Sequence, residues 1–130
     1  VASEVVKLMV RRGKSLPRSR ILVLGFTFKE NCPDVRNTRV VDVVRELRSY
    51  GAAVDIYDPW ADAAAVHEEY GIDLLQAAPR PGSYDAMVLA VAHRQFHDLG
   101  VNAIRALGVG DAVLYDIKSM LPADQVDARL

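Results

Sequence analysis

The segment Ile21–Thr38, ILVLGFTFKENCPDVRNT, decides the fold. It begins with the apolar run Ile21–Leu24, breaks at Gly25 and reaches a helix pattern at Asn37. A short apolar run that ends in glycine and leads into a helix is typical of a buried parallel strand and its strand-to-helix turn. The loop between them is longer than the roughly 2–6 residues usual for such a turn. Because open α/β sheets bind ligands at the carboxyl ends of their strands, this loop is the first candidate site.

The rest of the chain alternates strands with helices. Short apolar runs predict five strands: Arg20–Leu24, Ala53–Tyr57, a weak one at Ile72–Leu75, Ala86–Val91 and Ala112–Tyr115. Apolar residues at helical spacing predict four helices: Ala2–Arg12, Asn37–Tyr50, Ala61–Tyr70 and Asp98–Leu107. The tail Pro122–Leu130 is predicted as a short turn or a frayed helix. This alternation indicates an α/β fold, a Rossmann-like open parallel sheet with helices on both faces and, numbering strands along the chain, the order 3-2-1-4-5.

The first helix has an unusually wide apolar stripe. Val1, Val5 and Leu8 lie on one line, and further apolar residues widen it. Two arrangements fit: the helix folds back on its own domain, or it belongs to a preceding domain or a dimer interface. A short basic linker follows, so the sequence divides into a helix with its linker, 1–19, and a domain, 20–130. The chain begins Val-Ala rather than with methionine, which suggests a piece of a longer protein.

Composition narrows the class of protein. The net charge of −1 gives no reason to expect nucleic acid or an anionic membrane as partner. No apolar run approaches the roughly 18 residues that a membrane span needs. The single cysteine, Cys32, cannot form a disulfide within the chain and fits a reducing compartment, so we expect a cytoplasmic protein.

The long loop carries residues that suit an anionic ligand. Lys29 and Arg36 are cations beside the start of a helix, where phosphate oxygens or a ribose hydroxyl bind well. Phe28 offers an apolar face to a ring. The turn at Gly25 lacks the G-x-G-x-x-G pattern that lets a pyrophosphate approach the backbone, so an ordinary dinucleotide site is not expected. The alternative is that both cations are solvated and that the aromatic ring covers the end of the sheet.

Four further residues are weaker candidates. Asp58 ends a strand where a ribose-binding acid would lie, but because a proline follows, it also suits a turn. His93 and His97 are four residues apart, yet no third metal ligand is evident, so no metal is expected. Lys118 follows the last strand and so faces the same edge of the sheet as the long loop, with Asp116 as a potential ion-pair partner.

Three motifs in succession resemble the C-terminal domain of the UDP-glucose/GDP-mannose dehydrogenase family. They are G-x-x-F-K from Gly25, D-x-R-N-T from Asp34 and V-x-x-Y-D-P from Val54. The resemblance covers nearly the whole chain. The runs TFKENCPD from Thr27 and AHRQF from Ala92 look most like the branch that oxidises UDP-N-acetylhexosamines for bacterial polysaccharide biosynthesis, with UDP-glucose as the other substrate type.

The resemblance implies an oxidoreductase that uses NAD to oxidise C6 of a nucleotide sugar from alcohol to carboxylate. NAD would be bound mainly by a separate N-terminal domain, and this domain would bind the UDP-sugar. Phe28 and Lys29 match positions that contact the UDP-sugar, and Arg36 matches one that reaches NAD. Val1–Gly13 matches the end of a central dimerisation helix, which implies a homodimer of the full-length enzyme whose own domains are this domain's partners.

Cys32 invites assignment as a catalytic nucleophile. In the family this thiol lies in a separate glycine-rich motif outside the matched region, and Cys32 has no such stretch before it. We therefore expect no catalytic residue in this chain, which should be inactive alone. An open alternative is a non-catalytic nucleotide-sensing or assembly module. A phospho-receiver domain is disfavoured, because it needs a pair of acids after the first strand, where this chain has Gly25-Phe26-Thr27.

Overall fold

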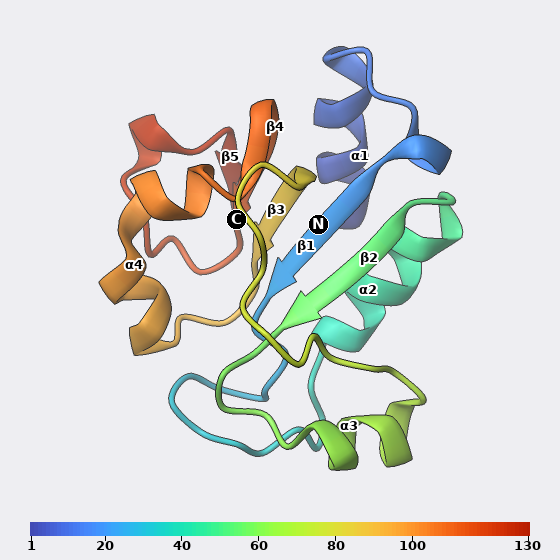
Figure 1. Cartoon of the computed structure of the whole chain (residues 1–130), viewed down its shortest axis with the longest axis vertical. Helices are drawn as coiled ribbons and strands as arrows, with labels where there is room; N and C mark the ends of the chain where they lie inside the picture. The colour runs from blue at the N-terminus through green and yellow to red at the C-terminus, as the bar shows by residue number, and fades with distance from the viewer.

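A computed structural model describes all 130 residues as a single parallel sheet with helices on both faces (Figure 1). The strand order is β2-β1-β3-β4-β5, and every neighbouring pair is parallel. The strands are β1 (Arg20–Leu24), β2 (Ala53–Tyr57), β3 (Tyr84–Leu89), β4 (Gly108–Asp116) and β5 (Ala128–Arg129). The helices are α1 (Ala2–Arg11), α2 (Val40–Ser49), α3 (Ala63–Tyr70) and α4 (Arg94–Arg105), with short 3₁₀ turns at Leu16–Arg18 and Ala123–Gln125. The predicted fold class is confirmed.

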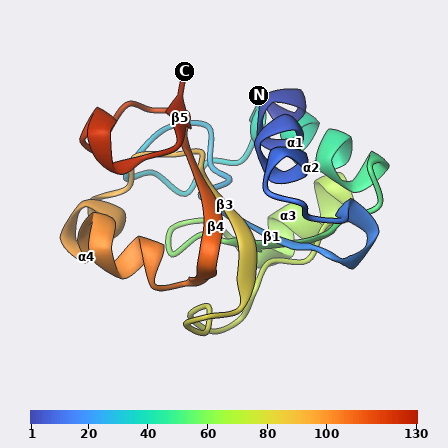
Figure 2. The same cartoon turned by 90° about the horizontal axis from the view of Figure 1, so that it is seen from above.

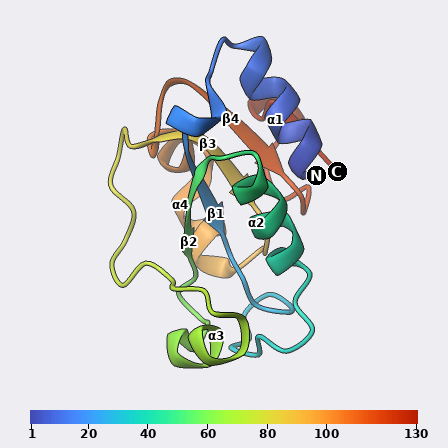
Figure 3. The same cartoon turned by 90° about the vertical axis from the view of Figure 1, so that its right-hand side faces the viewer.

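Two hydrophobic cores lie on opposite faces of the sheet. Ile21 and Val23 of β1 join the core beneath α1 and α2, whereas Leu22 and Leu24 join the core beneath α4. Figures 2 and 3 show these helices on opposite sides of the strands. Because a strand covered on both faces buries its side chains on both sides, residues Ile21–Leu24 of β1 form an unbroken apolar run in the sequence rather than an alternating one. None of the helices is long and apolar enough to cross a membrane.

The connections place a crevice between β1 and β3. The chain leaves β1 through α2 on one face and leaves β3 through α4 on the other. The segments after these two neighbouring strands therefore diverge, which is the switch point where open α/β sheets bind ligands. The long loop from Phe26 to Arg39 lies at this edge of the sheet (Figure 1).

The prediction of a strand at Ile72–Leu75 is wrong. One backbone hydrogen bond joins this segment to the sheet, from the N–H of Leu75 to the carbonyl of Ile56 at 2.8 Å. The fifth strand is instead Ala128–Arg129. It is the outer strand on the other side of the sheet, where the tail pairs with the end of β4. Two residues are too few to show a sequence periodicity, so the tail was not recognisable as a strand. The predicted order of the other four strands is confirmed.

Three helix starts differ from the prediction, by two residues in α3, which begins at Ala63, and by more in α2 and α4. α2 begins at Val40, and the hydroxyl of Thr38 accepts a hydrogen bond from the Val40 N–H at 3.2 Å. α4 begins at Arg94, four residues before the predicted start at Asp98, and is interrupted at Gly100, whose φ is 77°. The early start of α4 matters for function, because His93, the residue before the helix, then lies in hydrogen-bond contact with the long loop.

Helix α1 packs on the sheet of its own chain. Ala2, Val5 and Met9 are fully buried in the core that α1 shares with α2. The guanidinium of Arg12 donates to the carbonyls of Asp111 and Ala112, at 3.0 and 2.8 Å. Most of the apolar stripe of α1 is therefore buried against the sheet of its own chain, so the helix folds back on its own domain. The division into segments 1–19 and 20–130 stays a prediction.

Candidate functional site

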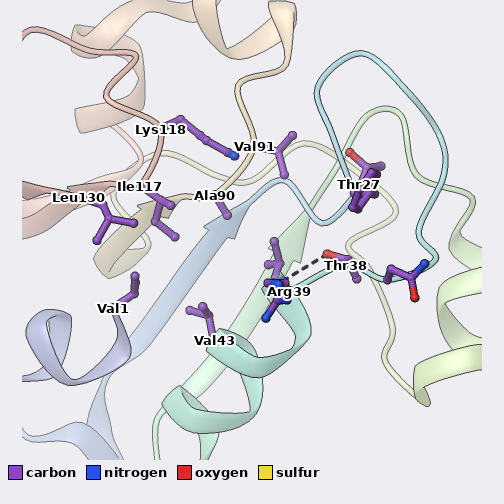
Figure 4. Close-up of a pocket in the computed structure, with 13 residues that line it drawn as sticks. Val1, Thr27, Thr38, Arg39, Val43, Ala90, Val91, Ile117, Lys118 and Leu130 are labelled. Carbon is purple, nitrogen blue, oxygen red and sulfur yellow. Dashed lines mark hydrogen bonds between the residues drawn. The ribbon is translucent and has the colours of Figure 1, made fainter.

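A cavity of about 420 Å³ lies at the switch point, at the carboxyl ends of β1, β3 and β4 (Figure 4). The segment after each of these strands contributes two consecutive residues to the wall: Thr27 and Phe28, Ala90 and Val91, Ile117 and Lys118. The start of α2 closes another side with Thr38 and Arg39. Pockets for small ligands are typically about 300–1,000 Å³, mostly apolar with a few polar groups, and this cavity has those properties.

Two cations line the cavity from different elements. Lys118 comes from the segment after β4, and Arg39 directly precedes α2. Both are exposed and neither takes part in an ion pair. No acidic side chain lines the cavity. The N-terminus of α2 adds its partial positive charge, so the cavity favours an anion with several oxygens.

The three residues predicted as a binding site share one loop but not one cavity. Phe28 lines the cavity, and 57% of its surface is exposed. Lys29 follows it, exposed and outside the lining. Arg36 is farther along the loop, and its guanidinium donates to both carboxylate oxygens of Asp34, at 3.1 and 3.2 Å. These hydrogen bonds, together with one from the Arg36 backbone, hold the pKa of Asp34 below its ordinary value.

Arg39 was missed by the sequence analysis, and Lys118 was left as a weak candidate. The signal for Arg39 was its position, one residue after the D-x-R-N-T motif and at the start of a helix. The suggested ion pair of Lys118 with Asp116 is wrong. The buried carboxylate of Asp116 accepts instead from the backbone N–H groups of Lys118 and Leu121, at 3.0 and 2.7 Å, which leaves the Lys118 ammonium free.

Asp58 organises the backbone around the site from a fully buried position. Its Oδ1 accepts from the N–H groups of Trp60 and Ala61, at 2.7 and 3.0 Å. This is the turn role that the sequence suggested. Its Oδ2 accepts from the N–H groups of Phe26 and Thr27, at 2.6 and 3.1 Å, which the sequence did not suggest. A carboxylate with no exposed surface cannot bind a ribose, so the alternative role is excluded.

His93 completes this cluster. Its Nε2 lies 3.0 Å from Asp58 Oδ2 and 3.2 Å from the Thr27 hydroxyl, and its Nδ1 accepts from the Asn31 N–H at 3.0 Å. Because Nδ1 accepts a hydrogen bond, it carries no proton, so Nε2 carries it and donates to Asp58. His93 is therefore neutral. Both side chains have no exposed surface, and no buried side-chain nitrogen or oxygen in the chain lacks a partner.

The Asp58 carboxylate gives stability a pH dependence. Burial disfavours its charge, but hydrogen bonds from His93 and from the backbone of Phe26 and Trp60 outweigh burial and hold its pKa below the ordinary 3.8. A lowered folded-state pKa stabilises the protein above the ordinary pKa, and this contribution is lost as pH falls through the folded-state pKa. We expect the free energy of unfolding, measured in urea between about pH 5 and about pH 3, to fall less steeply in Asp58→Asn than in the wild type. Equal slopes would contradict this, since Asp34, Asp111 and Asp127 contribute equally to both.

Gly25 shows why the first turn does not fit a dinucleotide. Its φ is +97°, and a Cβ added there would lie 2.6 Å from the Cβ of Val91. The glycine therefore allows close packing between the ends of β1 and β3 rather than the approach of a pyrophosphate. The residues of this turn do not fit the pyrophosphate of NAD, in agreement with the missing glycine pattern.

Cysteine and histidine chemistry is absent from the site. Cys32 is a free, half-buried thiol on the loop. His93 is used in the buried cluster and His97 is exposed, so the pair shares no ligand position. No group of three or more His, Cys, Asp or Glu side chains is placed to hold a metal ion.

Comparison with known proteins identifies the relatives of this fold and cavity. Residues 22–123 match the sequence model of the UDP-glucose/GDP-mannose dehydrogenase family, UDP binding domain. The chain belongs to this family. A UDP-N-acetyl-D-glucosamine 6-dehydrogenase of Salmonella typhi is 49% identical over 130 residues, which are 100% of this chain and 30% of that protein. A protein of the same name from Pseudomonas aeruginosa is 48% identical over 100% of this chain and 31% of its own length.

A solved structure shares the fold of this chain. NDP-N-acetyl-D-galactosaminuronic acid dehydrogenase from Methanosarcina mazei Go1 superposes with a TM-score of 0.77 at 21% identity, over 95% of this chain and 26% of that one. The match to the family model and the identities of 49% and 48% confirm the family predicted from the three motifs. The present chain spans about 30% of the length of the curated relatives it matches, and it corresponds to the UDP-binding domain of the family.

Proposed function

We propose that this chain is the UDP-binding domain of an NAD-dependent dehydrogenase that oxidises C6 of a UDP-N-acetylhexosamine to a carboxylate. One observation carries most weight: a cavity at the switch point with two unpaired cations and one exposed aromatic ring. The identity of 49% to a UDP-N-acetyl-D-glucosamine 6-dehydrogenase supports a UDP-N-acetylhexosamine over UDP-glucose as the nucleotide sugar.

The cavity offers each part of a nucleoside diphosphate a partner. A diphosphate needs cations that are not already neutralised, and Arg39 and Lys118 meet that need from two walls. Phe28 offers its face to the uracil or ribose. Lys29, next to it but outside the cavity, is placed to reach sugar hydroxyls or a phosphate oxygen at the rim. The bound UDP would thus hold the sugar at the open edge of the sheet.

The oxidation itself needs parts that this chain does not hold. NAD would supply the hydride acceptor from a separate domain, and Arg36, on the outer part of the loop, would be this chain's contact to it. Its ion pair with Asp34 would have to open or be shared for that contact. We further propose that the chain has no activity alone, that α1, packed on its own sheet, is also the end of a dimerisation helix of a homodimer, and that the enzyme works in the cytoplasm for polysaccharide biosynthesis.

Binding of UDP by the chain, followed by NMR chemical shifts, tests this function. Arg39→Ala and Lys118→Ala should each weaken UDP binding about 10- to 150-fold, because a lost charge-assisted hydrogen bond costs about 1.5–3 kcal/mol. Lys29→Ala should weaken UDP-N-acetylglucosamine at least as much as UDP. Arg36→Ala should leave UDP affinity unchanged, since Arg36 lies outside the cavity.

Lys7→Ala is the matched control, because Lys7 is an exposed lysine on α1 outside this cavity. If it weakened UDP as much as Lys118→Ala, the binding would reflect overall charge rather than a site. Unchanged affinity in both Arg39→Ala and Lys118→Ala would remove the diphosphate from this cavity. A response of the chain to NAD⁺ but not to UDP would overturn the assignment.

A further inference from the structure

We propose that Asp58 and His93 are positioning residues for the nucleotide-sugar site. Their buried pair fixes the loop Thr27–Asn31, and the loop in turn places Phe28 and Lys29 at the cavity. The inference rests on the proposed function and deepens it, because it names the groups that set the geometry of the site without touching the ligand.

The loop has no helix or strand of its own, so its shape depends on individual hydrogen bonds. At its start, the N–H of Thr27 is held by Asp58 Oδ2, and the Thr27 hydroxyl lies 3.2 Å from His93 Nε2. At its end, the N–H of Asn31 is held by His93 Nδ1. Phe28 and Lys29 lie between these two anchors. Two further hydrogen bonds lie within the loop: the Phe28 N–H donates to the Asp34 carbonyl at 2.8 Å, and the Thr27 hydroxyl donates to the Lys29 carbonyl at 2.8 Å.

The cluster joins three strand ends into one unit. Asp58 follows β2, His93 lies between β3 and α4, and the loop follows β1. Asn31 adopts a left-handed backbone conformation with φ 55°, and its side-chain oxygen accepts from the N–H of Arg94 at the first turn of α4. A non-glycine residue holds this conformation only where its surroundings require it. The position of the loop is therefore coupled to the start of α4 through His93 and Asn31.

Histidine suits this position because it has one donor and one acceptor on opposite sides of a small ring. Nε2–H serves the carboxylate, and Nδ1 serves the backbone of the loop. Alanine would remove both contacts. Glutamine can keep a donor toward Asp58 but not the acceptor for Asn31, and asparagine can keep the acceptor but not the donor. The two amide variants therefore separate the two halves of the cluster.

Full burial distinguishes positioning from ligand contact. Neither the Asp58 nor the His93 side chain has any exposed surface, so an effect of either on affinity must pass through the loop. Lys118 lies on a different wall of the cavity, and its backbone N–H bonds to Asp116 rather than to this cluster. The proposal thus predicts that substitutions of His93 and Lys29 have non-additive effects on binding affinity, whereas those of His93 and Lys118 are additive.

A double-mutant cycle measures this coupling. His93→Ala should weaken UDP-N-acetylglucosamine binding about 10-fold, on the order of one or two net hydrogen bonds. In that background Lys29→Ala should have little further effect, whereas Lys118→Ala should cost as much as in the wild type, because distant sites add and coupled ones do not. His67→Ala is the matched control: His67 and Asp73 form a histidine–carboxylate pair at 2.7 Å, but both are exposed, so binding should not change.

A second measurement needs no ligand. Hydrogen exchange at the Phe28 amide, which donates to the Asp34 carbonyl, should be faster in His93→Ala and His93→Gln than in the wild type and His67→Ala, while exchange in β1 stays slow. Fluorescence of Trp60 reports whether the cluster is intact, since it is the only tryptophan, the centre of its ring lies 6.3 Å from that of His93, and its backbone N–H donates to Asp58. If His93→Ala does not fold, His93→Gln and His93→Asn carry the same comparison.

The outcomes separate this inference from the proposed function. UDP binding that depends on Lys118 but is unchanged by His93 substitution, or a cycle in which His93 and Lys29 are additive, overturns the positioning role alone. Unchanged loop exchange in every His93 variant overturns it as well. A wild-type chain that binds no UDP, with loop exchange that responds to His93 as expected, overturns the nucleotide function and leaves His93 as an organiser of the loop.

Discussion

Replacing Asp58 with alanine should lower the free energy of unfolding by about 3–5 kcal/mol, the range seen when one partner of a buried polar cluster is removed. The carboxylate accepts five hydrogen bonds, four from backbone N–H groups and one from His93. Each donor left without a partner in a buried place costs about 1–3 kcal/mol, and water that enters the space left by the side chain recovers part of this. Urea denaturation followed by circular dichroism measures the change.

Two comparisons make the Asp58 prediction specific. Asp73→Ala removes an exposed carboxylate that also pairs with a histidine, and it should cost no more than about 0.5 kcal/mol. Asp58→Asn keeps one carbonyl acceptor and should lie between the two. A cost for Asp58→Ala as small as that for Asp73→Ala would mean that the buried cluster does not hold the strand ends together.

The local sequence pattern was sufficient to predict most strands of the sheet. Apolar runs as short as Ile21–Leu24 predicted strands correctly because strands of a parallel sheet are buried on both faces. The same reasoning failed at Ile72–Leu75, where Ile72 and Leu74 are buried but the chain makes one bond to the sheet and then runs outward to Pro79. Burial without a partner strand has the same sequence pattern as an edge strand, so only the tertiary structure distinguishes them.

The sequence predicted where the candidate cavity lies but not most of the residues that line it. The long loop and Phe28 follow from the rule that ligands bind beyond strand ends, which needs only the first strand and its turn. Arg39 and Lys118 are 79 positions apart in the sequence and line the same cavity because α2 begins, and β4 ends, at the same edge of the sheet. The pair of Asp58 and His93 is equally non-local, at a separation of 35 residues. Nothing near either residue indicates the other, so their partnership requires the fold.

Gly25→Ala should destabilise the chain by about 3–5 kcal/mol, because two costs combine at this residue. Its φ of +97° is unfavourable for any residue with a Cβ. The added Cβ would also lie 2.6 Å from the Cβ and 2.9 Å from the backbone N of Val91. Val91 cannot withdraw freely, since its N–H and that of Ala90 both donate to the Leu24 carbonyl, at 3.3 and 2.8 Å. Relief of the clash must therefore separate the ends of β1 and β3.

Gly82→Ala separates the two costs. Gly82 also has a positive φ, +67°, but a Cβ there would meet nothing within 4 Å. Its substitution should cost only the conformational part, about 1–2 kcal/mol, in the same urea experiment. Any folded Gly25→Ala should also bind UDP more weakly, since Val91 lines the cavity, whereas Gly82→Ala should bind it normally. Equal costs for the two alanines would show that the ends of β1 and β3 can move apart freely, and the cavity between them would then not be a rigid site.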